Sequence, residues 1–173
     1  MPTDTPILHL VCGLAAAGKS SLAAELGRDA HTVVIAEDAW LAALFADEMT
    51  SIPDYVRYAA RLRAIIGPHV TALLRTGVSV VLDFPANTVE NRQWMRLVAE
   101  AAGVPHRLHY LDVPTDICMA RLRDRNARGD HPFTLTDDQF FRLAKHFVPP
   151  SAAEGLEIVV HGWRQDGGGE PDR

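Results

Sequence analysis

The chain has few cysteines and no excess of positive charge. Its 173 residues include only two cysteines, Cys12 and Cys118, which lie far apart in apolar surroundings and predict reduced, buried thiols instead of a disulfide framework. The formal net charge of −5 gives no global support for the basic face with which proteins neutralise nucleic-acid phosphates. Duplex binding is therefore disfavoured.

The sequence also lacks a long apolar run and a secretion signal. No apolar stretch is long enough to cross a bilayer, and residues 1–6 lack the basic start and apolar segment of a leader. With the low cysteine content, this predicts a cytoplasmic protein. We expect a single domain over residues 1–163, and a disordered tail over residues 164–173 without a role in chemistry.

Five short apolar runs alternate with longer helical stretches. Near-continuous Val, Ile and Leu runs are typical of a parallel sheet covered on both faces, so the alternation predicts a doubly wound α/β fold. A long helix is expected over Asp54 to Thr76, which Gly67-Pro68 could interrupt. The predicted strands cover residues 7–12, 32–36, 78–82, 107–111 and 156–160.

A glycine-rich loop follows the first predicted strand and precedes a helical stretch. It matches the P-loop (Walker A) pattern, in which backbone N–H groups wrap around phosphate oxygens, a lysine adds charge and a serine binds magnesium. The strand–loop–helix context is the one that this chemistry requires. The predicted nucleotide-binding residues are Gly13, Ala15, Ala16, Ala17, Gly18, Lys19, Ser20 and Ser21.

Two aspartates follow strands of the predicted sheet. Ligands collect at the carboxyl ends of parallel strands, so both are candidate site residues. Asp83 ends the third strand, as does the aspartate that holds magnesium in P-loop enzymes, and we assign it to the metal together with Ser20. Asp38 follows the second strand and is the candidate base for an acceptor hydroxyl, although Glu37 beside it could do the same.

Arginines are expected around the moving phosphoryl group, because its transfer depends on positioning and on cations. Arg121 and Arg125 share one face of a helix, and we assign them to a lid over ATP; the alternative is a solvated face paired with Asp124. A further set of arginines is predicted to contact the acceptor or the transferred phosphate. These are Arg57, Arg61 and Arg92.

The chain resembles the small P-loop kinases grouped with chloramphenicol phosphotransferase, zeta toxins and the kinase domain of polynucleotide kinase. The likeness is carried by the loop from Gly13 to Ser20, by Asp38, by Asp83 with Asn87 and Arg92, by Asp112-Val-Pro-Thr115, and by Pro149-Pro150 with Glu154-Gly155. It implies the strand order 2-3-1-4-5, magnesium-ATP as donor, Asp38 as base, and a mobile lid around Arg121 to His131. It does not identify the acceptor.

These patterns together predict a kinase that moves the γ-phosphate of ATP to a hydroxyl group of a small molecule such as an antibiotic, sugar or nucleoside. Two alternatives stay open. One is a P-loop ATPase or nucleotide switch that acts on a protein partner, and the other is a kinase of nucleic-acid 5′ ends, which would need a basic channel with stacking aromatics.

Overall fold

The computed structural model describes residues 5–129, 131 and 133–163. Its centre is a five-stranded parallel sheet in the order β2-β3-β1-β4-β5, as predicted. Each strand begins and ends within two residues of the predicted run, because a buried strand of a parallel sheet is recognisable in the sequence as an unbroken apolar stretch. The strands are β1 (Leu8–Cys12), β2 (Thr32–Ala36), β3 (Ser79–Asp83), β4 (His106–Asp112) and β5 (Ile158–Gly162).

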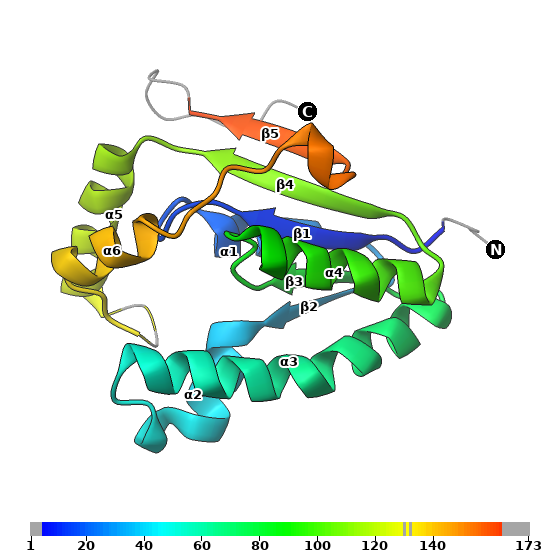
Figure 1. Ribbon diagram of the computed structural model, residues 1–173, viewed down its shortest axis with the longest axis horizontal. Helices are drawn as coiled ribbons and strands as arrows, with labels where there is room; N and C mark the ends of the chain where they lie inside the picture. Colours follow the sequence, from blue (N-terminus) through cyan, green and yellow to red (C-terminus); the bar gives the residue numbers. More distant parts are fainter. Residues whose placement is uncertain (1–4, 130, 132, 164–173) are drawn as a thin grey trace.

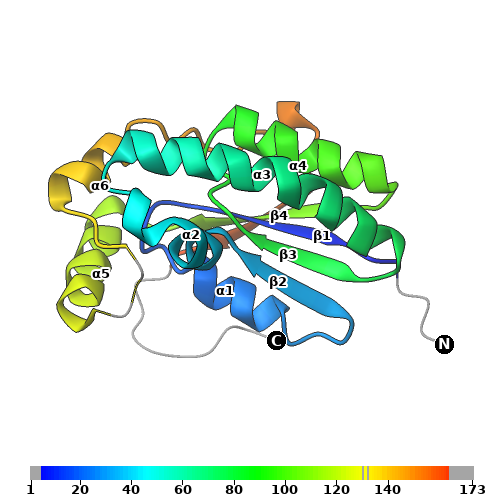
Figure 2. The same ribbon diagram turned by 90° about the horizontal axis from the view of Figure 1, so that it is seen from below.

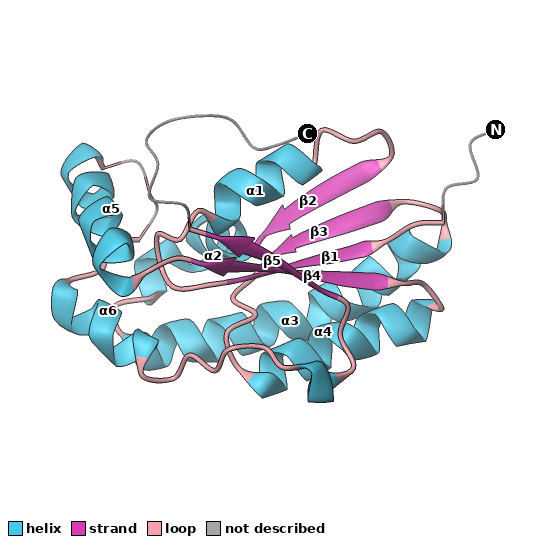
Figure 3. Ribbon diagram, turned by 90° about the horizontal axis from the view of Figure 1, so that it is seen from above, coloured by secondary structure: helices cyan, strands magenta, loops and turns pink. Residues whose placement is uncertain are grey.

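Helices cover both faces of the sheet, with α3 and α4 on one face and α1 on the other (Figures 2 and 3). Helices α5 and α6 lie beyond the carboxyl ends of the strands (Figure 1). Within the described part of the chain, no helix combines the length and apolarity needed to cross a membrane. The helices are α1 (Lys19–Leu26), α2 (Glu37–Phe45), α3 (Ile52–Arg75), α4 (Val89–Ala102), α5 (Thr115–Arg128) and α6 (Asp137–Ala144), with short 3₁₀ turns at η1 (Ala46–Glu48) and η2 (Ala152–Glu154).

Helix α3 runs without a break through Gly67 and Pro68, where an interruption seemed possible. One stripe of the helix, which includes Tyr58, Leu62 and Ile66, is buried in the main core. A Cβ atom on Gly67 would lie 3.6 Å from the Trp94 ring on α4, an ordinary van der Waals contact, so this position faces α4. Burial of this stripe outweighs the local cost of proline, because most helix stability in proteins comes from tertiary packing.

Two hydrophobic clusters fill the interior. The larger lies between the sheet and helices α3 and α4, and the smaller packs Cys118, Leu122 and Phe140 beneath the loop after β1. Both cysteines are free and buried, as the sequence predicted. The smaller cluster fixes α5 and α6 against the glycine-rich loop. The tail predicted over residues 164–173 lies outside the described residues.

Candidate functional site

The loop from Gly13 to Gly18 connects β1 to α1 in a conformation that few sequences allow. Gly18 has a φ of 106° and Ala16 a φ of 61°, both in the left-handed region. A Cβ atom on Gly13 would lie 3.0 Å from the Leu111 carbonyl oxygen, so the first glycine is required by close packing against β4. Gly18 caps α1 without a side-chain hydrogen bond, which leaves the amides at this helix N-terminus available to an anion.

Lys19 bends back over this loop from the first turn of α1. Its Nζ donates to the carbonyl oxygens of Gly13 and Leu14, at 2.8 and 2.7 Å. Burial lowers the pKa of Lys19, while the attraction of Asp83 opposes this change. The ammonium group therefore lies against the loop that would hold phosphate, within electrostatic reach of Asp83.

Asp83 and the turn that carries Asp38 meet at the same edge of the sheet, since Ala36 of β2 pairs with Asp83 of β3. Burial raises the pKa of the Asp83 carboxyl, while a hydrogen bond from Ser20 and the charge of Lys19 act in the opposite direction. The two residues assigned to magnesium from the sequence, Ser20 and Asp83, are therefore neighbours.

The two adjacent acids after β2 have different environments. Glu37 is fully buried, and its carboxylate accepts hydrogen bonds from Tyr55 Oη at 2.6 Å and from Arg63 Nε at 2.9 Å. The Asp38 side chain is 40% exposed, and its Oδ2 lies 3.3 Å from Nε2 of His131. Of the two carboxylates, only that of Asp38 is open to an incoming molecule.

The α5 arginines divide between the site and the surface. Arg121 donates to the Ala17 carbonyl oxygen at 3.2 Å, and its guanidinium lies 4.7 Å from the centre of the Trp163 ring. Arg125 has a buried Nε with no hydrogen-bond partner in the described residues. Burial lowers the pKa of Arg125, and the charge of Asp38 opposes this change. Asp124 pairs with Arg128 at 3.3 Å, so the solvated-face alternative applies to that end of the helix.

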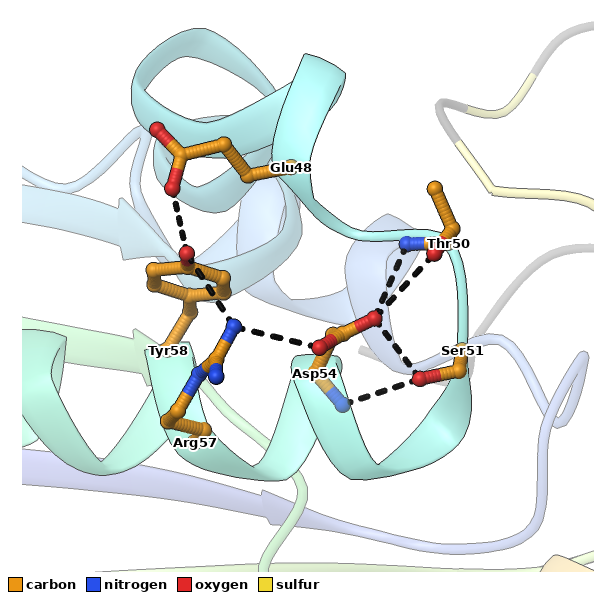
Figure 4. A network of polar contacts seen from close by, with 6 residues as sticks. All are labelled: Glu48, Thr50, Ser51, Asp54, Arg57 and Tyr58. Atoms are coloured by element: carbon orange, nitrogen blue, oxygen red, sulfur yellow. Dashed lines mark hydrogen bonds and ion pairs between the residues drawn. The ribbon is translucent and has the colours of Figure 1, made fainter.

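Arg57 and Arg61 lie at the start of α3, around Tyr58. Figure 4 shows Arg57 between Asp54 and the Tyr58 hydroxyl, at 3.1 and 3.2 Å, while Tyr58 donates to Glu48. The same Asp54 accepts from Ser51 Oγ at 2.7 Å and from Thr50, and so fixes the first turn of the helix (Figure 4). Arg61 lies 5.4 Å from the centre of the Tyr58 ring. None of these contacts joins either arginine to Asp38.

Arg92 is fully buried, so the prediction that it contacts the acceptor or the transferred phosphate is corrected. Its Nε and Nη2 donate to the two carboxylate oxygens of Glu154, at 2.6 and 3.0 Å. Its Nη1 donates to the carbonyl oxygens of Ala86 and Val148, at 3.0 and 2.9 Å. With every nitrogen engaged and no exposed surface, Arg92 ties the segment around η2 to the start of α4.

Sequence reasoning did not single out three residues at this edge. Arg63 binds Glu37 and Asn91, His131 pairs with Asp38, and Trp163 lies beneath Arg121. The local pattern does not separate Arg63 from Arg57 and Arg61, which lie on the same helix. Asn87, which carried part of the resemblance, accepts a hydrogen bond from the Gly13 amide at 3.1 Å.

The fold and the loop geometry are those of a small P-loop kinase. A family model described as an AAA domain matches residues 8–150, and the chain belongs to this family. No curated protein matches the chain.

Solved structures share the fold. A kinase-like protein of Chloroflexus aurantiacus is 19% identical with a TM-score of 0.71, over 91% of this chain and 85% of that protein. Chaetomium thermophilum Kti12, in complex with ADP-AlF3, is 16% identical with a TM-score of 0.71, over 92% and 90% of the two chains. The Mycobacterium tuberculosis APS kinase CysC, in complex with AMPPNP and APS, is 23% identical with a TM-score of 0.61, over 94% and 91%.

Proposed function

We propose that this protein transfers the γ-phosphoryl group of magnesium-ATP to a hydroxyl group of a small molecule. The observation that carries the proposal is the open carboxylate of Asp38 at the strand edge that also holds Asp83 and the P-loop. A nucleotide switch needs the P-loop but no solvent-accessible base beside it. An acceptor kinase needs both.

The amides of the loop from Gly13 to Gly18 and of Ser20 and Ser21 would bind the phosphate oxygens, with Lys19 supplying positive charge. Arg121 and Arg125 would close over the nucleotide, and the unpaired Nε of Arg125 is a donor that a phosphate oxygen would satisfy.

Ser20 and Asp83 would hold the magnesium ion. They are oxygen donors, as magnesium prefers, and the described residues contain no group of three His, Cys, Asp or Glu side chains that would form an all-protein metal cage. A pair of protein oxygens is the donor set of a magnesium ion that keeps waters and phosphate oxygens as its other ligands. When bound, the ion would neutralise charge on the phosphates.

Asp38 would take the proton of the acceptor hydroxyl while the oxygen of that hydroxyl forms a bond to the γ-phosphorus. The bond from that phosphorus to the bridging oxygen breaks, and its electron pair leaves with ADP. Because His131 pairs with the same carboxylate, an acceptor would have to share or displace this contact.

The test is a panel of hydroxylated metabolites, nucleosides, sugars and antibiotics incubated with the purified protein and magnesium-[γ-³²P]ATP. We expect at least one labelled product, which the Lys19→Ala variant does not form. Normal ATP binding without any labelled acceptor would contradict the proposal. Partner-stimulated ATP hydrolysis, or labelling of an oligonucleotide 5′ end alone, would replace it with one of the two alternatives.

A further inference from the structure

Arg63 is the polar centre of the interface between α2, α3 and α4. Its side chain is 19% exposed and contacts Glu37 twice, with Nε at 2.9 Å and Nη2 at 3.4 Å from the two carboxylate oxygens. Its Nη1 donates to Oδ1 of Asn91 at 2.7 Å. The guanidinium also lies 5.7 Å from the centre of the Trp94 ring. One side chain of α3 therefore contacts both neighbouring helices.

The contact with Glu37 fixes the first turn of α2. Glu37 is the first residue of this helix, and the preceding Ala36 provides no side-chain cap. The turn is instead held through the buried Glu37 carboxylate by Arg63 and Tyr55, both from α3. Asp38 is the next residue in the same turn. Any rotation or shift of Glu37 therefore moves Asp38 with it.

The contact with Asn91 connects Arg63 to the loop that follows β3. Asn91 Nδ2 donates to the carbonyl oxygen of Pro85 at 3.1 Å, in the loop that begins directly after Asp83. The same loop contains Asn87, which accepts from the Gly13 amide of the P-loop at 3.1 Å. Hydrogen bonds thus connect the turn that carries Asp38 to the loop after β3, and the backbone of that loop leads from Pro85 to Asn87, which contacts the P-loop.

We propose that Arg63 is a positioning residue that sets the placement of Asp38 relative to Asp83 and the P-loop. This inference rests on the proposed function, in which Asp38 acts on the acceptor. Arg63 lies behind the reacting groups and acts through Glu37 and Asn91. Its planar fork suits this task, because it holds a carboxylate and an amide at once, whereas the single ammonium of a lysine cannot match that geometry.

The decisive experiment measures phosphate release from magnesium-ATP, with water as acceptor, in the Arg63→Lys variant. Lysine keeps a cation beside the buried Glu37, so we expect a folded protein whose Kd for magnesium-ATP changes by less than about twofold. Because small misplacements of reacting groups are costly, we expect kcat to fall by about tenfold or more. The matched control is Arg107→Lys on β4, which alters the exposed pair with Glu157 and should retain wild-type kcat.

A double variant separates positioning from general structural damage. If Arg63 acts through Asp38, then Arg63→Lys should slow the Asp38→Asn protein little further, because the group that it positions is already absent. Equal slowing in both backgrounds would overturn the inference. Should Arg63→Lys lose its cooperative unfolding transition, Asn91→Leu tests the same chain with the Glu37 pair intact, and it too should lower kcat.

The outcomes distinguish the two proposals. Suppose that Asp38→Asn is slow but kcat is unchanged in Arg63→Lys, or in Asn91→Leu where that variant replaces it. This result overturns the positioning role alone. Two results overturn the assignment of Asp38 and this inference with it. In one, the wild-type protein binds magnesium-ATP but shows no turnover; in the other, Asp38→Asn leaves the turnover rate unchanged.

Discussion

The surroundings of Arg92 and of Arg125 show two ways in which this protein holds a partly or fully buried cation. Every nitrogen of the Arg92 guanidinium donates a hydrogen bond, to Glu154 or to the carbonyl oxygens of Ala86 and Val148. The buried Nε of Arg125 has no partner in the described residues. A buried donor without a partner costs free energy, and a ligand oxygen that accepted a hydrogen bond from Arg125 Nε would recover that cost.

The acidic residues repeat this contrast. Glu37 is buried and hydrogen-bonded by two side chains of α3, whereas Asp38 is half-exposed and Asp83 has its pKa raised by burial. Buried pairs thus connect separate segments of the scaffold, and Asp38 and Asp83 lie at the carboxyl ends of β2 and β3. This contrast distinguishes scaffold from site, and each of the following variants tests one side of it.

The largest effect is expected from Asp38→Asn. Loss of the proposed general base should lower the rate of phosphoryl transfer about 1000-fold, with ATP affinity nearly unchanged, because the proposed mechanism has this carboxylate act on the acceptor. Initial rates and calorimetry measure the two quantities. The neighbouring Glu37→Gln variant is the matched comparison and should lower the transfer rate less than Asp38→Asn does, because the buried Glu37 affects the chemistry only through the placement of Asp38. A fully active Asp38→Asn protein would remove this residue from the mechanism.

The second-largest effect is expected from Lys19→Ala. This variant should lower the transfer rate about 100-fold or more, because it removes a preorganised cation from the phosphates. Binding of magnesium-ATP, measured by calorimetry, should weaken as well. Lys145, the other lysine of the chain, is exposed at the end of α6 and provides the control. Equal rates for Lys19→Ala and Lys145→Ala would contradict the P-loop assignment.

Arg92→Leu tests the scaffold side. Breaking a buried pair leaves Glu154 uncompensated, so the free energy of unfolding should fall by about 3 kcal/mol, measured by urea denaturation. Arg107→Leu breaks the exposed pair with Glu157 and should cost about 0.5 kcal/mol. If Arg92→Leu were as stable as Arg107→Leu, the fully paired cluster would contribute no more than a surface ion pair.

The smallest effect concerns pH. His109 lies between His9 and His161 on adjacent strands, with ring nitrogens 3.1 Å apart on each side. Burial, and then the neighbouring His9 and His161, lower the pKa of His109 from 6.5 to about 4. Between these values the unfolded chain binds a proton that the folded protein does not, so the free energy of unfolding should decrease as pH falls from about 6.5 to about 4.

The measurement is the urea midpoint at pH 7 and pH 5. His109→Gln should reduce the difference between the two midpoints, while the exposed His69→Gln should leave it unchanged. An identical pH dependence in the wild-type and His109→Gln proteins would show that His109 titrates normally in the folded state.

The strands, the sheet order and the P-loop were predictable because their signals are local or belong to a recognisable motif. An unbroken apolar run marks a buried strand, and the glycine spacing marks a phosphate loop before any contact is known. The role of Arg92 was not predictable. Its position shortly after Asp83 suggested the site, but its partner Glu154 lies 62 residues further along the chain.

The sequence by itself determined the architecture, the P-loop and the two aspartates at the strand ends, since each depends on residue type and short-range spacing. Only the tertiary structure decided which of the adjacent acids is open and which arginines face the site. Glu37 and Asp38 are equivalent in local pattern, but α3 brings Tyr55 and Arg63 onto one of them. Burial and pairing of a charge depend on segments that meet only when the chain folds, which is why local sequence cannot specify them.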